Sequence, residues 1–449
     1  MTAPSTSASH STNQVTREST GAWREIAAAS VGNALEFYDL LVYGYFAITI
    51  GRLFFPTGDD MTSLLLSVGT FGISFVMRPL GAVFLGAYAD RAGRKKALTL
   101  SILLMMVGTG MIAFSPTYAS IGLWSPAIVI LARLVQGFST GGEFGAATAF
   151  MVEHAPASRR GFYASWQAST QGLATVMAAG LSAVITACMS AANVDAWGWR
   201  IAFVFGLLIG PVGFYIRRHV AETPEFVAAV RSAKTSESPL RALVSGNRAA
   251  LFLGGGVMAG ITGFNYVQKL YMPTFAVKQL HIPASSALAC AVITGLMLML
   301  FSPLFGSLSD RYGRGRCMTA SLGVVALSTY PLFALLVAYP TVATLLIVQA
   351  IVGLLLAAIL APMPALLAEL FPIGTRGSGL AISYNVSVTL FGGFAPLIVT
   401  WLIGATGNKM SPSFYVLATA LISLAALLSL RGWSRSGELV AAENGHFAR

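Results

Sequence analysis

A loop motif that occurs twice in the chain constrains the fold more than any other feature of the sequence. Residues 86–96 read Gly-Ala-Tyr-Ala-Asp-Arg-Ala-Gly-Arg-Lys-Lys, and residues 306–316 read Gly-Ser-Leu-Ser-Asp-Arg-Tyr-Gly-Arg-Gly-Arg, so every shared position is offset by 220 residues. A second pair follows in the same order, because residues 153–161 and 369–377 share the pattern Glu-x-x-Pro-x-x-x-Arg-Gly. Two matched pairs in matched order predict a chain of two related halves.

Long apolar segments flank both copies of the loop motif. The mean hydropathy of +0.72 and the charged fraction of 10% are too apolar for a soluble protein of 449 residues. A helix that crosses about 30 Å of hydrocarbon needs roughly 20 apolar residues, and the sequence has about twelve such segments. The segments lie near 28–51, 62–86, 98–116, 124–150, 162–188, 200–217, 249–272, 285–307, 317–338, 341–367, 378–402 and 412–431. The sequence therefore predicts an all-α membrane protein with twelve transmembrane helices in two pseudo-symmetric halves of six.

The longest polar interval separates the two sets of apolar segments and sets the expected domain boundaries. Five regions are predicted: an N-terminal tail (1–27), a six-helix bundle (28–217), a linker (218–248), a second six-helix bundle (249–431) and a C-terminal tail (432–449). The tails and the linker are expected in the cytoplasm.

The net charge of +11 does not indicate nucleic acid binding, because the positive residues are distributed by side of the membrane. With the N-terminus inside, 21 of the 28 Lys and Arg residues fall in the tails or inner loops, and four fall in outer loops. This bias follows the positive-inside rule. It predicts a multi-pass protein of the cell inner membrane with both termini in the cytoplasm.

Four further motifs resemble one family of transporters. They are Gly-Asn-x-x-Glu-Phe-Tyr-Asp at 32–39, Phe-Val-Met-Arg-Pro-Leu-Gly at 75–81, Arg-Leu-Val-Gln-Gly-Phe-Ser-Thr-Gly-Gly-Glu at 133–143 and Trp-Gly-Trp-Arg at 197–200. Together they resemble the metabolite:H+ symporter family of the major facilitator superfamily. The resemblance implies a proton-coupled secondary transporter that imports a small organic acid by alternating access and functions as a monomer, with its site near the bilayer midplane.

Two segments bear on the substrate. Residues 161–167 and 407–412 resemble the citrate and tricarballylate branch of the family, whereas Glu-Phe-Tyr-Asp at 36–39 is nearer to other branches. A tricarboxylate is therefore the first expectation. A same-family importer of 2-oxoglutarate, shikimate or a zwitterion such as betaine or proline remains the alternative.

Ionisable groups inside hydrocarbon are the candidates for proton coupling, because burying each one costs at least about 2.5–3.5 kcal/mol. Glu36 and Asp39 share one face of the first helix, and Glu143 lies on the fourth. Burial and a neighbouring like charge both favour the protonated form of a carboxyl group. The alternative is a carboxylate neutralised permanently by Arg78 or Arg133.

The candidates for substrate binding are polar groups inside the apolar segments. They are Arg78, Arg133, Gln136, Tyr43, Gln167, Gln171, Asn265, Tyr266, Lys269, Tyr384 and Asn385. Arginine suits a carboxylate because its planar fork donates two parallel hydrogen bonds. The three buried cations favour a multivalent acid. Two alternatives stay open: Arg133 as the permanent partner of Asp39 or Glu143, and Lys269 extending to the outer surface.

The repeated loops are expected to form ion-pair clusters that hold the halves closed on the cytoplasmic side. The predicted gating residues are Asp90, Arg91, Arg94, Glu153, Arg160, Asp310, Arg311, Arg314, Glu369 and Arg376. Single exposed pairs contribute only about 0–1 kcal/mol, but two clusters can bias conformers separated by a few kcal/mol. The alternative is that these loops only follow the positive-inside rule.

Other classes of function find little support in the sequence. The three cysteines show no paired spacing, so no metal or cofactor is expected. Gly-Phe-Ser-Thr-Gly at 137–141 matches a nucleophile-elbow pattern, but all five histidines lie in tails or loops, and the glycines at 137, 141 and 145 predict helix packing. The chain is not expected to be an enzyme. A transport-inactive ligand sensor is the alternative from another class.

Overall fold

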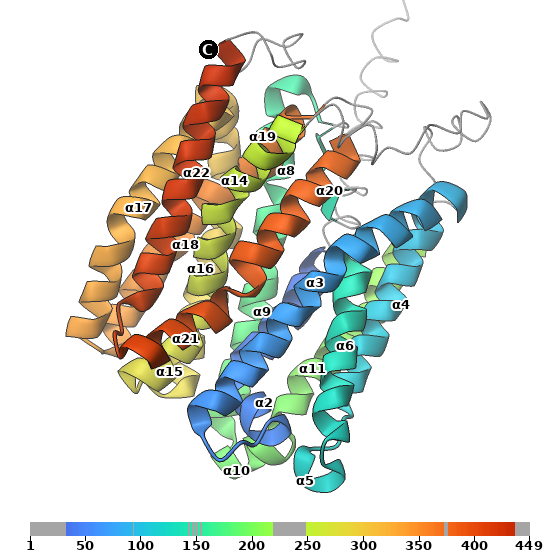
Figure 1. Ribbon diagram of the computed structural model, residues 1–449, viewed down its shortest axis with the longest axis vertical. Helices are drawn as coiled ribbons and strands as arrows, with labels where there is room; N and C mark the ends of the chain where they lie inside the picture. The colour runs from blue at the N-terminus through green and yellow to red at the C-terminus, as the bar shows by residue number, and fades with distance from the viewer. Residues whose placement is uncertain are drawn as a thin grey trace, which may run out of the picture.

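The computed structural model describes residues 33–435 except for 93, 142–143, 146–147, 149–150, 153–154, 219–247 and 372–375. All regular structure in these residues is helical, and the long helices run along one common direction (Figure 1). The helices of the first half are residues 33–45, α2 (Ala47–Phe54), α3 (Asp60–Ala92), α4 (Arg94–Ala113), α5 (Tyr118–Ile121), α6 (Trp124–Thr140), η1 (Ala157–Arg159), α8 (Arg160–Ala164), α9 (Trp166–Cys188), α10 (Ala191–Asn193), η2 (Val194–Gly198) and α11 (Trp199–Arg218).

The second half repeats this arrangement of long helices joined by short connections. Its helices are α14 (Arg248–Asn265), η3 (Tyr266–Tyr271), α15 (Met272–Leu280), α16 (Ala284–Tyr312), α17 (Arg314–Ala338), α18 (Val342–Leu360), α19 (Met363–Glu369), α20 (Arg376–Ser387), η5 (Val388–Gly393), α21 (Ala395–Thr406) and α22 (Ser411–Arg435). The segments η3 and η5 are π-helical turns within two long helices. Such turns are rare and occur mostly at functional sites.

Eight helical segments of the described residues are long and apolar enough to cross a membrane. Their outward faces carry large apolar side chains, such as Phe252 with 82% and Leu327 with 80% of the side chain surface exposed. Extended apolar faces of this kind are typical of helices that contact lipid. The expected third span is represented by a shorter apolar helix, residues 99–113.

Local sequence explains where the helices begin and turn. The Asp59 carboxylate accepts hydrogen bonds from the hydroxyl and the backbone N–H of Thr62, at 2.6 and 2.7 Å, and so caps the start of α3. These bonds hold the pKa of the Asp59 carboxyl below its usual value. At the second copy of the loop motif, Gly313 has a φ of 92°, a conformation that glycine adopts at little cost. This glycine forms the short connection between α16 and α17.

Glycines bring α3 and α6 into backbone contact within the first half. A Cβ atom on Gly137 would overlap the Ser74 carbonyl, and one on Gly141 would overlap the Arg78 carbonyl. Small residues permit this close approach of helices in membranes. The packing role predicted for this glycine spacing is therefore confirmed.

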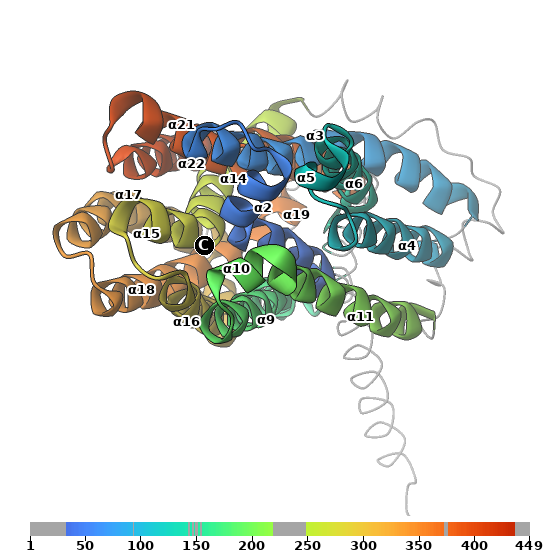
Figure 2. The same ribbon diagram turned by 90° about the horizontal axis from the view of Figure 1, so that it is seen from below.

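Two helix pairs join the halves, as both views of the molecule show for α9 and α16 (Figures 1 and 2). Gly172 of α9 and Gly295 of α16 each face the other's carbonyl group. The second pair is α3 against η5 and α21, where Phe75 covers Gly393 and Phe394 covers Gly72. The polar side chains of the interior lie between these two seams.

Candidate functional site

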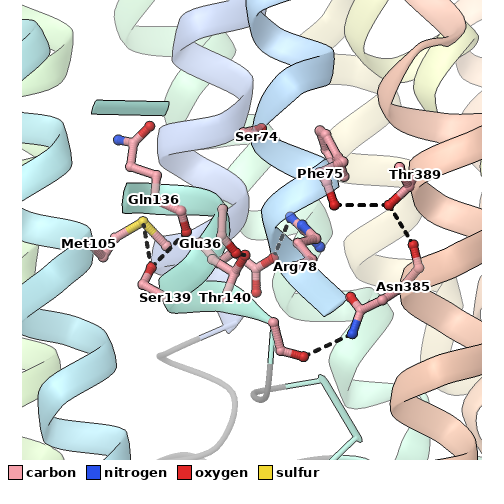
Figure 3. Close-up of polar contacts among 12 residues, drawn as sticks. Glu36, Ser74, Phe75, Arg78, Met105, Gln136, Ser139, Thr140, Asn385 and Thr389 are labelled. Atoms are coloured by element: carbon pink, nitrogen blue, oxygen red, sulfur yellow. Dashed lines mark hydrogen bonds and ion pairs between the residues drawn. The ribbon is translucent and has the colours of Figure 1, made fainter. Parts of the chain in front are cut away.

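A buried ion pair joins the first helix to α3. The Arg78 Nη2 atom lies 2.8 Å from Glu36 Oε1, and both side chains are almost completely buried (Figure 3). Tyr384 of α20 accepts a further hydrogen bond from Arg78. Removing one partner of such a pair costs about 3–5 kcal/mol, because the other charge stays buried. Glu36 and Arg78 thus adopt the pairing that the sequence left as an alternative.

Arg133 is held differently, mainly by aromatic rings. Its guanidinium carbon lies 4.1 Å from the centre of the Tyr43 ring and 5.2 Å from that of Phe71. The Nη1 atom donates to Gln136 Oε1 at 2.7 Å, whereas Nε and Nη2 have no hydrogen-bond partner among the described residues. Contacts with ring faces are attractive but leave the donors of the guanidinium open.

Asp39 is the second buried carboxylate of this region. It accepts one hydrogen bond from the Thr109 hydroxyl at 2.9 Å and another from the Gln136 amide. Gln136 therefore contacts both Asp39 and Arg133 and stands between the two charges. Thr109 was not predicted, because a single threonine within an apolar segment carries no signal of its position beside a carboxylate.

Lys269 lies inside the protein, with 3% of its surface exposed, so the alternative that it extends to the outer surface is wrong. Its Nζ atom donates to Gln171 Oε1 at 3.3 Å and lies 4.8 Å from the centre of the Phe37 ring. Both contacts belong to the first half, whereas Lys269 belongs to η3 of the second. No carboxylate of the described residues forms an ion pair with it.

The other candidates of the second half line the seam between the halves. Tyr266 meets the Phe75 ring edge-on at 5.5 Å, and its hydroxyl has no partner among the described residues. Asn385 donates to the Gly141 carbonyl at 2.8 Å, but its Oδ1 atom has no such partner (Figure 3). Tyr384 stacks on Phe144 with 3.5 Å between ring centres.

The remaining candidates have mixed surroundings. Gln167 accepts a hydrogen bond from Thr148 at 3.2 Å, while its amide nitrogen and Asn265 Oδ1 lack partners among the described residues. The Tyr43 hydroxyl donates to the Ser67 carbonyl at 3.2 Å. One residue outside the prediction stands out: Gln268 is fully buried, and neither polar atom of its amide has a described partner.

A small cavity connects the charged side chains of the first half. Its walls include Glu36, Asp39, Arg78, Arg133 and Gln136. Buried polar atoms without partners are uncommon in native proteins and often mark a ligand or water site. The guanidinium N–H groups that lack partners among the described residues can bind hydrogen-bond acceptors and negatively charged groups. Among the described residues, no group of His, Cys, Asp and Glu side chains could hold a metal ion.

The second copy of the loop motif makes a contact between the halves. The Asp310 carboxylate accepts hydrogen bonds from the backbone N–H groups of Gly161 and Phe162, at 2.8 and 2.9 Å, at the start of α8. Arg314 pairs with Asp310 at 2.7 Å and also with Glu369. The Asp310 contact joins the two halves at the end of the molecule at which α8 and α19 lie (Figure 1).

The other predicted gating residues do not join this contact within the described structure. Arg311 is exposed and lies over the Tyr312 ring at 5.5 Å, and Arg160 is half-buried. Several predicted side chains fall outside the described residues: Glu143, Asp90, Arg91, Arg94, Glu153 and Arg376.

Comparison with known families covers nearly the whole chain. Residues 26–247 match the model of the sugar (and other) transporter family, and residues 263–438 match that of the major facilitator superfamily. The citrate-proton symporter of Klebsiella pneumoniae is 35% identical over 89% of this chain and 90% of its own length. The alpha-ketoglutarate permease of Escherichia coli is 35% identical over 90% and 92%, and the proline/betaine transporter of that species is 32% identical over 89% and 82%.

Solved structures support the fold. The xylose transporter XylE from E. coli, in a partially occluded inward-open conformation, superimposes with a TM-score of 0.72 at 16% identity, over 92% of this chain and 98% of XylE. A D-xylose-proton symporter gives a TM-score of 0.70 at 19% identity, over 90% and 96%. The predicted architecture of twelve membrane helices in two halves is confirmed.

Proposed function

This chain belongs to the major facilitator superfamily, and from that premise we propose that it imports a small organic acid together with protons by alternating access. A tricarboxylate such as citrate or tricarballylate is the proposed substrate. The similarity to two citrate-proton symporters supports this choice. The chain is a carrier and not an enzyme, and the proposed location is the cell inner membrane.

One observation supports the anionic substrate most directly. Arg133 and Lys269 are buried cations from opposite halves, and no described carboxylate forms an ion pair with either. Burying a charge without a partner is costly, so such cations are expected to meet an anion in the working cycle. Arg78 differs because Glu36 already neutralises it. An acid with several carboxylates would offer a partner to each of these two cations.

The contact at Asp310 supports the gating part of the proposal. We assign the end of the molecule that carries Asp310 to the cytoplasm, because the positive loops lie there. Closing this end places the Asp310 carboxylate at the start of α8, where the helix dipole and free N–H groups favour an anion. Opening the end toward the cytoplasm requires these bonds to break.

Replacement of Asp310 by asparagine is therefore expected to shift the conformers toward the inward-open form. Hydrogen bonds to charged groups contribute about 1.5–3 kcal/mol each, so the population ratio should change roughly 10–150-fold. The readout is maleimide labelling of a single cysteine at Ser165, which is fully buried at this contact, in a variant whose native cysteines are replaced. Asp59→Asn, at the opposite end, is the control. Equal labelling of both variants would contradict a gating role.

Replacement of Lys269 by glutamine is expected to weaken a tricarboxylate far more than a monocarboxylate. The loss should be about 1.5–3 kcal/mol for citrate, the scale of a hydrogen bond to a charged group. Competition by citrate and by acetate against labelled citrate measures both affinities. Lys409→Gln is a matched control, because that lysine is exposed and donates to the Gln279 carbonyl, away from the buried site. Equal and small losses of affinity for citrate and acetate would show that Lys269 does not bind the substrate.

The proposed function as a whole is tested by uptake into proteoliposomes. The panel contains labelled citrate, tricarballylate, 2-oxoglutarate, shikimate, betaine and proline, each with and without an inward proton gradient. We expect gradient-dependent accumulation of citrate or tricarballylate. Preference for 2-oxoglutarate or betaine would indicate that the chain belongs to another branch of the family. If none of the six compounds were taken up, the proposal that the protein is a transporter would be contradicted. Uptake at the same rate with and without the proton gradient would contradict proton coupling but not transport.

A further inference from the structure

Asp39 borders two separate cavities. The first is the cavity described above, which also touches Arg78 and Arg133. The second lies inside the bundle of the first half, among the helix 33–45, α4, α6 and α11. It does not touch either arginine or any residue of the second half. Neither cavity is lined by a residue of the second half, but only the first includes Arg133, the cation proposed to bind the substrate. A substrate held at Arg133 would therefore meet the first cavity, whereas Asp39 lines both.

The second cavity carries hydroxyl groups along an otherwise apolar wall. Thr109 lines it and donates to Asp39, and Ser139 and Ser101 line the same cavity. All three are more than nine-tenths buried. A cavity with polar partners and sufficient room holds water, and chains of water and hydroxyl groups conduct protons.

Small and flexible residues keep this cavity open. On α11 the wall is formed by Gly206 and Gly210, where a Cβ atom on Gly210 would come within 2.6 Å of the Met106 sulfur. On the opposite side, Met105 contacts the Ser139 hydroxyl at 4.0 Å (Figure 3). Methionine adapts its shape readily, so these side chains can admit or exclude water.

The cavity extends in one direction along the bundle. From Asp39 and Thr109 it reaches Ser101 and Gly210, which lie nearer the end at which α3 joins α4. That end was assigned to the cytoplasm above. The charged and titratable groups around Asp39 are Glu36 and Tyr38 on its own helix, Arg78 on α3 and Arg133 on α6. Among the described residues, α4 and α11 contribute only uncharged side chains to this wall.

We propose that the cavity within the first half is the exit for the coupled proton, separate from the path of the substrate. The proton leaves a carboxyl oxygen of Asp39 for a water molecule, which passes a proton along the Ser139 and Ser101 side of the cavity to the cytoplasm. This proposal rests on the proposed function, since it names the route of the proton in the same transport cycle.

The test fills the cavity without touching Asp39. Ser139→Leu from α6 and Leu207→Phe from α11 are the filling variants, and Leu207→Ala keeps the space open without removing a hydroxyl group. Two rates are measured in proteoliposomes with labelled citrate: accumulation driven by a proton gradient, and citrate exchange at equal pH on both sides. Exchange depends on an open path for the substrate, but it can proceed without net release of a proton from the protein.

The filling variants should lose at least about tenfold in gradient-driven accumulation, while exchange stays within about twofold of the unmodified protein. Leu207→Ala should retain both rates. Normal accumulation in both filling variants would overturn the proposal, and so would an equal loss of exchange, which would indicate packing or substrate passage. If the unmodified protein neither accumulates nor exchanges citrate or another acid, the proposed function itself fails, and the two failures are thus distinguished.

Discussion

Replacement of Asp39 by asparagine is expected to abolish accumulation of substrate against its gradient while exchange continues. The amide cannot carry a proton through the cycle, although it nearly preserves the shape of the carboxyl group. It can still accept the hydrogen bond from Thr109, but its NH2 group would face the amide of Gln136. Each coupled proton that moves down one pH unit supplies about 1.4 kcal/mol, which supports about tenfold accumulation. The variant should instead equilibrate substrate to equal concentrations.

Uptake of labelled citrate with an inward proton gradient measures this effect, and exchange at equal pH shows whether the protein still binds and reorients. Asp195→Asn is the control, because Asp195 forms an exposed pair with Arg52, away from the buried site. Normal accumulation by the Asp39 variant would show that another carboxyl group carries the proton. Glu36 and Glu143 would then be tested next.

Replacement of Arg133 by glutamine is the second change for which we expect a large effect, a loss of about 1.5–3 kcal/mol in citrate affinity, or roughly 10–150-fold. The unoccupied Nε and Nη2 atoms lie on one edge of the guanidinium, which suits two parallel bonds to a carboxylate. Arg133→Lys should lose nearly as much, because an ammonium group cannot form that pair of bonds or stack on Tyr43 in the same way. Isothermal titration of the purified variants with citrate gives the affinities.

Arg52→Gln is the matched control for this measurement. Arg52 forms an exposed ion pair with Asp195, and such pairs contribute only about 0–1 kcal/mol to stability. If Arg133→Lys bound citrate as tightly as the unmodified protein, the guanidinium would serve packing against the aromatic rings and not ligand binding.

The fold could be predicted from features that can be read directly in a single sequence. The repeated loops indicated two halves, the apolar segments gave the helices, and the spacing of Gly137 and Gly141 predicted the contact between α3 and α6. These signals are local or periodic, so a single sequence carries them. The π-helical turns at η3 and η5 have no such pattern, because they arise where packing between helices overrides the regular hydrogen bonding.

The candidate site was predicted less completely. The sequence identified the buried charges but left their pairing open, because Arg78 and Arg133 were each possible partners for a carboxylate. Only the structure separates an arginine bound to Glu36 from one held by ring faces. Lys269 illustrates the same difficulty, since its depth depends on Phe37 and Gln171 from the other half of the chain.

The position of Gln136 has a thermodynamic consequence. A single amide touches both the carboxyl group proposed to bind the proton and the guanidinium proposed to bind the acid. A ligand that draws Arg133 away from Gln136 releases this amide and changes how it meets Asp39. Linkage requires reciprocity, so the factor by which citrate alters proton affinity equals the factor by which protonation alters citrate affinity. We therefore expect Gln136 to contribute to the coupling between proton binding and citrate binding, and Gln136→Leu to reduce this coupling more than it reduces the affinity for either ligand.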